Sequence, residues 1–144
     1  MTFNTIRLAI FTMGTRLGFA FNAVILACIS VSSFAQGLAE IDVMAAAQQI
    51  LEKQIKVLDV REPSEFTTGV ISGALLMPLG QVEKRLAELD GFKNQPMYVV
   101  CGSGGRSAQA IKILVKNGFT QLTNIKGGMT AWRKANLPVV APAN

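Results

Sequence analysis

Short apolar runs alternate with segments of helical character, and this alternation constrains the fold more than any other feature of the sequence. Residues 56–60, 74–77, 97–100 and 121–125 have the composition of short strands. Helical segments separate these runs and follow the last of them. Strands that alternate with helices favour a parallel sheet covered by helices. We therefore expect an α/β fold, with a mostly parallel central sheet and helices on both of its faces.

The first three predicted helices lie before residue 90. Residues 41–54 form one, and Asp42 is a suitable N-cap, because a carboxylate can accept a hydrogen bond from the first turn. Pro63 suits the first turn of a short second helix, where a missing N–H costs nothing. Apolar side chains recur on one side of residues 81–89, which predicts a third, amphipathic helix.

Two further helices follow glycine-containing turns. Residues 107–116 predict a helix that ends at Asn117 and Gly118, a usual C-terminal signal. Residues 127–134 begin with two glycines and predict a last helix, whose Trp132 we expect in the core. The sequence contains no internal repeat, so these elements belong to a single domain.

Residues 1–35 have the pattern of a secretory signal peptide. The segment contains two arginines and no acidic residue, and residues 17–31 are almost entirely apolar or small. Ser33 and Ala35 place small side chains three positions and one position before Gln36. A basic flank, a short apolar core and small residues before the cut are typical of such peptides. We predict cleavage before Gln36 and export of the remaining domain to the periplasm or another extracytoplasmic space.

Other interpretations of this segment stay open. An uncleaved membrane anchor is one, although the apolar run is shorter than the ~20 residues that span a bilayer. A lipoprotein signal is another, with Cys28 as the acylated N-terminus. A buried helix of the domain is the third, and the lack of a polar solvent face argues against it. The membrane is a partner only if the segment is retained or acylated.

The charge of the remaining domain is modest. Residues 36–144 number 109 and carry a net charge of +3, because Arg7 and Arg16 belong to the N-terminal segment. No run of lysine or arginine is present, so we expect no nucleic-acid partner. The domain is long enough to fold as a monomer, which is the state we expect.

The cysteine and histidine content of the chain limits the kinds of catalytic group and metal site that it can have. Cys101 is the only cysteine in residues 36–144, which excludes an internal disulfide and dithiol exchange there. The whole chain has no histidine, which excludes a Ser-His-Asp or Cys-His pair and a histidine-based metal site. We expect no metal or other cofactor. Cys101 therefore needs activation by something other than an imidazole.

Cys101 directly follows the apolar run 97–100 and begins a glycine-rich turn into a helix. Ligands of an open parallel sheet bind outside the carboxyl ends of its strands. Gly102, Gly104 and Gly105 let the backbone curl, so that successive N–H groups point inward and form a nest for an anion. Helix N-termini and basic neighbours can lower a cysteine pKa to about 3.5–7.5. The turn predicts a reactive thiolate, whereas a merely buried cysteine would not require this loop.

Several ordered segments resemble the signatures of the rhodanese family, and together they cover nearly all of residues 36–144. The pattern Cys-x-x-x-x-Arg-Ser resembles the active-site loop of that family. Other segments of this chain resemble the first and the closing signatures of the family. The matching segments are residues 58–66, 73–74, 78, 101–107, 118–119 and 124–132. The chain is thereby identified as a single rhodanese-like domain that follows an N-terminal signal.

The resemblance implies transfer of sulfane sulfur. The Cys101 thiolate would take the outer sulfur of thiosulfate or a related anionic donor, hold it as a persulfide, and pass it to a thiol or to cyanide. The implied substrate-binding residues form the loop: Gly102, Ser103, Gly104, Gly105, Arg106 and Ser107. Their N–H groups would stabilise the moving negative charge. Asp59 and Arg61 are expected to support the loop from the end of the neighbouring strand.

Two points stay open in this site. Arg106 either holds the sulfonate oxygens of the donor or forms an ion pair across the loop, for example with Asp59. The second question is whether the domain is an enzyme or a persulfide carrier that hands sulfur to a protein partner. Gly102 favours the carrier, because it leaves the mouth of the pocket open. Phosphatase or arsenate chemistry is disfavoured, because the related loops have five residues between cysteine and arginine, and this loop has four.

Overall fold

The computed structural model describes residues 37–142. The predicted signal peptide, its cleavage site and Cys28 lie outside these residues. Among the helices of residues 37–142, none is both long enough and apolar enough to cross a membrane.

The centre of the domain is a five-stranded parallel sheet with the strand order β1-β5-β4-β2-β3. The strands are β1 (Glu40–Ile41), β2 (Lys56–Asp59), β3 (Leu75–Leu76), β4 (Met97–Val100) and β5 (Leu122–Ile125). Four of them, β2, β3, β4 and β5, lie within the strand segments predicted from the sequence. β1 was not predicted, because two residues at the edge of a sheet leave no periodic pattern. The expected α/β fold with a parallel sheet is confirmed.

Side chains of the central strand β4 alternate between the two faces of the sheet, as a period of two residues requires. Met97 and Val99 belong to one apolar cluster, and Tyr98 and Val100 belong to the other. All four residues are buried. Burial on both faces explains why this strand is a continuous apolar run in the sequence.

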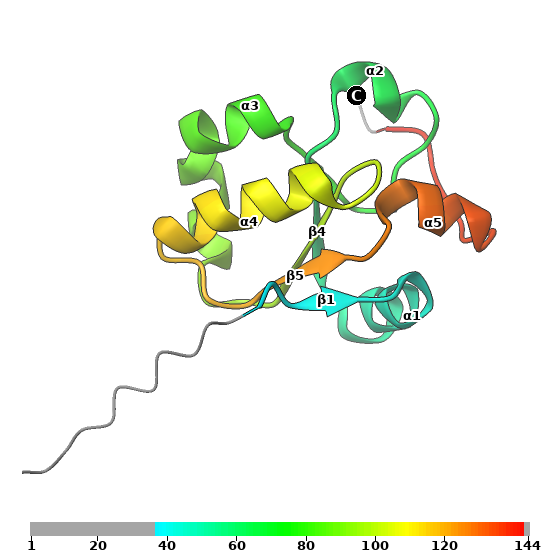
Figure 1. Cartoon of the computed structure of the whole chain (residues 1–144), viewed down its shortest axis with the longest axis horizontal. Coiled ribbons are helices and arrows are strands. Elements are labelled where there is room, and N and C mark those ends of the chain that lie inside the picture. The colour runs from blue at the N-terminus through cyan, green and yellow to red at the C-terminus, as the bar shows by residue number, and fades with distance from the viewer. Residues whose placement is uncertain (1–36, 143–144) are drawn as a thin grey trace, which may run out of the picture. The chain divides into compact units, whose positions relative to one another are not determined.

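Helices cover both faces of the sheet. In Figure 1, α3 and α4 lie on one side of it, and α1 and α5 lie on the other. The helical segments are α1 (Val43–Lys53), α2 (Pro63–Phe66), α3 (Leu79–Val82), the 3₁₀ segment η1 (Glu83–Phe92), α4 (Gly105–Lys116) and α5 (Gly128–Lys134). Asp42 caps α1 as predicted, with its carboxylate accepting from the N–H groups of Met44 and Ala45.

The amphipathic segment predicted over residues 81–89 is helical and packs Val82, Leu86 and Leu89 on the core, but it is not one continuous helix. The segment divides into α3 and η1, and Arg85 has non-helical backbone angles. Leu86, Leu89 and Phe92, three residues apart, all pack on the cluster beneath α4. A 3₁₀ helix has three residues per turn and brings such a set onto one face, which an α-helix does less well.

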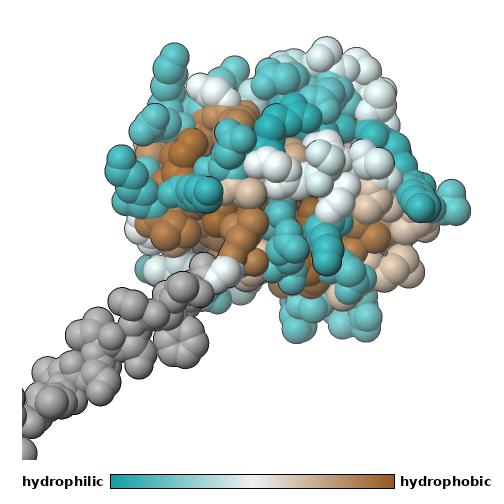
Figure 2. All heavy atoms as spheres, in the orientation of Figure 1, coloured by the Kyte–Doolittle hydropathy of each residue, from teal (hydrophilic) through white to brown (hydrophobic). Residues whose placement is uncertain are grey.

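The outer surface of the described domain is mixed in character. Figure 2 shows hydrophilic side chains over much of one face, with hydrophobic surface between them over α3 and α4. Val115 of α4 is among the exposed apolar side chains. At the C-terminal end of the described chain, Val140 forms an antiparallel bridge with Val70. This bridge ties the last residues to the segment that follows α2.

Candidate functional site

Cys101 is the first residue after the central strand β4. It continues the alternation of Met97 and Val99, so its side chain faces the cluster under α4. The thiol is free, and only 1% of the residue is exposed. The chain then turns at Gly104, whose φ of +109° is readily available only to glycine, and enters α4 at Gly105. The turn places the start of α4 over the sulfur atom.

Hydrogen-bond donors of the loop converge on the Cys101 sulfur. The N–H of Gly104 lies 3.1 Å from Sγ, and the hydroxyl oxygen of Ser107 lies 3.4 Å from it. Burial alone would raise the pKa of the Cys101 thiol. The Ser107 hydroxyl and the N–H groups of Ser107, Gly104 and Ser103 lower it, and the net effect is a pKa below the ordinary value. The thiolate is therefore stabilised without an imidazole.

Ser107 is held in turn by Asn124 of β5. Its hydroxyl donates to Asn124 Oδ1 at 2.6 Å, and both residues are buried. Asn124 Nδ2 donates to Glu40 Oε1 of β1 at 3.1 Å. The Ser107 hydroxyl has a single proton, and Cys101 Sγ, Asn124 Oδ1 and the Gly104 carbonyl all lie within its reach. Asn124 and the thiolate therefore compete for the same donor.

The start of α5 orients the peptide groups that follow Cys101. The N–H of Met129 donates to the Cys101 carbonyl at 2.8 Å, and the N–H of Thr130 donates to the Gly102 carbonyl at 2.9 Å. C=O and N–H point in opposite directions across a trans peptide. With the Gly102 carbonyl turned toward α5, the N–H of Ser103 turns away from α5 and toward the sulfur.

Gly128 makes this close approach possible. A Cβ atom at this position would lie 2.3 Å from the Cys101 carbonyl oxygen, and the φ of Gly128 is +56°. No side chain fits at such a distance, so the two elements touch through bare backbone.

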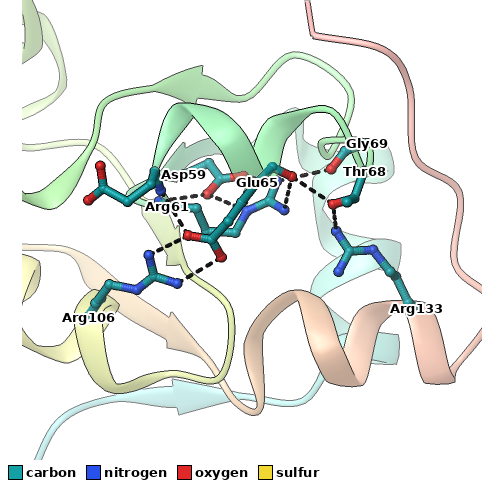
Figure 3. Close-up of polar contacts among 8 residues, drawn as sticks. Asp59, Arg61, Glu65, Thr68, Gly69, Arg106 and Arg133 are labelled. Carbon is teal, nitrogen blue, oxygen red and sulfur yellow. Dashed lines mark hydrogen bonds and ion pairs between the residues drawn. The ribbon is translucent and has the colours of Figure 1, made fainter.

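Arg106 forms a two-point ion pair with Glu65 of α2. Nη1 lies 2.5 Å from Glu65 Oε2, and Nη2 lies 2.9 Å from Oε1 (Figure 3). These hydrogen bonds are the largest of the contributions that bring the pKa of Glu65 to about 2, and the N–H of Glu62 and the charges of Arg106 and Arg61 lower it further. The same two hydrogen bonds raise the pKa of Arg106 above its usual value, and the charges of Glu65, Cys101 and Glu62 add to this effect. The ion pair considered from the sequence exists, but its acidic partner is Glu65 and not Asp59.

Asp59 pairs with Arg61 instead, in a buried contact at the end of β2. Arg61 Nη2 lies 2.6 Å from Asp59 Oδ2, and the residues are 1% and 0% exposed. The guanidinium also donates to the carbonyls of Glu65 at 3.1 Å and Gly69 at 3.0 Å. The pair thus links the end of β2 to the last turn of α2 and to the segment that follows it, as Figure 3 shows, and supports the loop indirectly through Glu65.

The turn from Cys101 to Ser107 thus lies at the carboxyl end of β4, where the sequence predicted it. Three contributing residues were not singled out by sequence reasoning: Glu65, Asn124 and Gly128. Two of them had a signal, since Asn124 is a polar residue within a predicted strand and Gly128 belongs to a double glycine before a helix. Within residues 37–142 there is no group of three or more Cys, Asp or Glu side chains placed to hold a metal ion.

Comparison with protein families gives a match over residues 43–135 to the family described as "Rhodanese-like domain". A protein of Allochromatium vinosum named "Sulfurtransferase" is 34% identical over 104 residues, which cover 72% of this chain and 95% of that protein. The "Thiosulfate sulfurtransferase GlpE" of Vibrio cholerae is 35% identical over 101 residues, covering 70% and 93%. The "Putative sulfur carrier protein YrkF" of Bacillus subtilis is 37% identical over 102 residues, covering 70% and 54%.

Among solved structures, a rhodanese-related protein from Thermoplasma volcanium superimposes on the domain with a TM-score of 0.65. The two sequences are 29% identical, and the match covers 72% of this chain and 99% of the other. Its fold agrees with the parallel sheet and the helical layers described above.

Proposed function

Because this chain belongs to the rhodanese-like domain family, we propose that it is a sulfurtransferase that carries sulfane sulfur as a persulfide on Cys101. Relatives named as sulfurtransferases and as a sulfur carrier support sulfur transfer in general. The observation that carries the proposal is the buried Cys101 sulfur, which lies within reach of the Gly104 N–H and the Ser107 hydroxyl.

The proposed cycle has two displacements at sulfur. The Cys101 thiolate attacks the outer sulfur of a donor such as thiosulfate; the new S–S bond forms as the donor's S–S bond breaks, and sulfite leaves with the electron pair. An acceptor, a thiol in the cell or cyanide in an assay, then attacks the outer sulfur of the persulfide. The S–S bond to Cys101 breaks, and the thiolate is restored. No oxidant or cofactor enters this balance.

The loop supplies the electrostatic part of the mechanism. The thiolate and the persulfide are both anionic, and the N–H groups of Ser103, Gly104 and Ser107 are directed at the sulfur. Donors that are fixed before the reaction lose little energy in reorganisation, which is the main advantage of such a site. Gly102 and Gly105 contribute backbone only, and Arg106 contacts the two carboxylate oxygens of Glu65 through Nη1 and Nη2.

The first test is a measurement of mass. The chain is incubated with thiosulfate and the intact protein is weighed, beside a Cys101→Ser variant treated in the same way. We expect a gain of one sulfur atom on the wild type alone, lost again on addition of cyanide as thiocyanate appears. A sulfur that also adds to the Cys101→Ser variant would place the carrier atom elsewhere.

A second candidate is a persulfide carrier that delivers sulfur to a protein partner without rapid turnover. Gly102, which leaves the mouth of the loop without a side chain, and the relative named as a putative sulfur carrier favour it. The steady-state rate with thiosulfate and a small thiol separates the two. Rapid turnover supports the enzyme, whereas one sulfur loaded per chain with slow release supports the carrier.

A further inference from the structure

A series of hydrogen-bonded side chains connects the Cys101 sulfur with the edge of the sheet. The Ser107 hydroxyl lies 3.4 Å from the sulfur and donates to Asn124 Oδ1 at 2.6 Å. Asn124 Nδ2 donates in turn to Glu40 Oε1 at 3.1 Å. Cys101, Ser107 and Asn124 are at most 2% exposed, whereas Glu40 is exposed. The series therefore links a buried sulfur to a carboxylate at the surface.

Glu40 fixes the orientation of the Asn124 amide. The two residues face each other in the register between β1 and β5, which lie side by side at one edge of the sheet (Figure 1). A carboxylate can only accept a hydrogen bond, and so can the Gly104 carbonyl, which lies 3.4 Å from Asn124 Nδ2. The NH₂ end of the amide must point at these two acceptors. Its oxygen, which can only accept, is left facing Ser107.

This orientation determines where the single proton of the Ser107 hydroxyl lies. Asn124 Oδ1 is 2.6 Å from the hydroxyl oxygen, and the Cys101 sulfur is 3.4 Å from it. The Gly104 carbonyl is a third acceptor at 2.9 Å, but it already accepts from the N–H of Ala108 at 3.1 Å. Asn124 is thus the strongest competitor of the sulfur for this proton. The hydroxyl can donate to the sulfur only when it gives up Asn124.

The demand of the sulfur for the proton changes during sulfur transfer. Cys101 Sγ carries a full negative charge as a thiolate, and it is uncharged as the inner sulfur of a persulfide. Hydrogen bonds to a charged acceptor are roughly twice as strong as neutral ones. The hydroxyl should therefore return to Asn124 when the persulfide forms. It should turn to Sγ when the outer sulfur leaves and charge develops on Cys101.

We propose that Asn124, oriented by Glu40, is a positioning residue that holds the Ser107 hydroxyl away from the Cys101 sulfur and releases it when Cys101 becomes the leaving group. The inference rests on the proposed function. Ser107 keeps its O–H bond throughout, and only the acceptor of its hydrogen bond changes. The nucleophilicity of a thiolate falls with its pKa, and a thiolate of lower pKa leaves faster. Asn124 thus favours attack on the donor and slows the second step.

The first test measures the pKa of Cys101 in the full chain. Alkylation by iodoacetamide is followed against pH, and it is read on the peptide that contains Cys101 by mass spectrometry. Asn124→Leu keeps the approximate shape of the side chain and removes the competing acceptor. We expect this variant to lower the pKa of Cys101 by up to about one unit, the value of one modest hydrogen bond.

Glu40→Gln tests the orientation of the amide. Without the carboxylate, the Asn124 amide can turn its NH₂ end toward Ser107, so we expect a smaller fall of the Cys101 pKa. Glu52→Gln is the matched control, because Glu52 Oε1 also accepts from a side-chain amide, that of Gln48 at 2.9 Å, on the exposed surface of α1. It should leave the alkylation profile unchanged.

A second set of variants separates this role from a plain effect of charge. Loss of the negative charge of Glu40 can lower the Cys101 pKa directly, and this effect does not depend on Ser107. Each variant is therefore repeated in a Ser107→Ala chain, where we expect Asn124→Leu to have no effect. The charge of Cys101 acts on Arg106, which Glu65 holds, and both residues are kept in every variant.

The two steps of transfer give a readout that a purely structural role would not produce. They are measured separately, well above the Cys101 pKa, as loading from thiosulfate and unloading by cyanide. For a pKa lower by one unit, loading by Asn124→Leu should be about threefold slower and unloading about threefold faster. A variant with a merely damaged loop would be slower in both steps.

Two results would overturn the inference: an unchanged or higher Cys101 pKa in a folded Asn124→Leu variant, or a fall of the pKa that persists in the Ser107→Ala chain. If Asn124→Leu does not fold, Glu40→Gln decides by the same comparison with and without Ser107. Failure of the proposed function looks different, because Cys101 would then gain no sulfur while the alkylation profiles still respond as expected.

Discussion

At the scale of single residues, the state of the Cys101 thiol depends on one hydroxyl that can be removed without touching the backbone. The Ser107 hydroxyl lowers the pKa of Cys101, so Ser107→Ala should raise that pKa by up to about one unit, the value of one modest hydrogen bond. The pH dependence of alkylation by iodoacetamide measures it. Ser103→Ala is the control, because Ser103 contributes its N–H and not its exposed side chain. Equal profiles for the two variants would contradict the role of the hydroxyl.

A second prediction at the scale of residues concerns the contribution of Glu65 to the stability of the fold in acid. Its pKa in the folded state, about 2, lies below the ordinary value of 4.5. The stability that it contributes is therefore fully present above pH 4.5 and is lost as the pH falls toward 2. The free energy of unfolding of the wild type minus that of Glu65→Gln should shrink over this range. A difference that stays constant from pH 7 to pH 2 would show that the ion pair contributes nothing.

The local chemistry of the loop was predictable, and its partners were not. A strand end, three glycines and a helix start are adjacent in sequence, so the position of Cys101 at the carboxyl end of β4 follows from the pattern alone. The partner of Arg106 depends on which of the acidic residues between the end of β2 and α2 faces the loop. Asp59 is taken by Arg61, only two positions away, and this leaves Glu65 for Arg106. Such competition between neighbours is settled only in three dimensions.

At the scale of elements, the contact between α5 and the active-site turn is the feature most sensitive to a single methyl group. Gly128→Ala would place a Cβ atom 2.3 Å from the Cys101 carbonyl oxygen, so α5 or the turn has to move. The N–H of Ser103 would then lose its direction toward the sulfur. We expect a higher Cys101 pKa, a slower transfer of sulfur and a lower stability, measured by alkylation, by turnover and by chemical denaturation.

Gly73→Ala is the matched control for this variant. Gly73 also has a positive φ, +72°, but a Cβ atom there would meet no atom within 4 Å. This variant should show only the cost of backbone strain, about 1 kcal/mol, and an unchanged Cys101 pKa. If Gly128→Ala resembled Gly73→Ala in its alkylation profile, α5 would have no part in orienting the loop.

The elements themselves were predictable to different degrees. α4 and β4 carry strong signals, because apolar side chains recur at helical spacing along α4 and β4 is a continuous apolar run. The η1 segment does not, since the spacing of Val82, Leu86 and Leu89 fits an α-helix until Phe92 is included with them. β1 owes its existence to pairing with β5, a contact over more than 80 residues of sequence that no local pattern reveals.

At the scale of the whole molecule, both apolar clusters draw their residues from positions 41–137. The part of the chain that the structure describes therefore contains its own core, on both faces of its sheet. Such a domain should fold without the N-terminal segment. We expect residues 36–144 to unfold in a single cooperative transition in urea, with the same midpoint as the corresponding part of the full chain. A shallow, non-cooperative transition would show that residues 1–35 contribute to the core.

The N-terminal segment carries the last prediction, which concerns where this domain works. We propose that the protein is exported and is cleaved before Gln36. The basic flank, the short apolar core and the small residues Ser33 and Ala35 support this proposal. The full chain is produced in a bacterium, the periplasm is separated, and the mass of the intact protein gives its N-terminus. We expect a periplasmic protein that begins at Gln36.

A bulky charged residue one position before the cut should block the protease, so Ala35→Arg is the control and should leave the uncleaved chain in the membrane fraction. An acylated protein that begins at Cys28 would replace simple cleavage with a lipid anchor, and the domain would still lie outside the cytoplasm. A protein with an intact N-terminus in the cytoplasm would contradict export altogether. The acceptor thiol would then have to be sought among cytoplasmic thiols, because the donor and acceptor available to Cys101 are those of the compartment that the protein reaches.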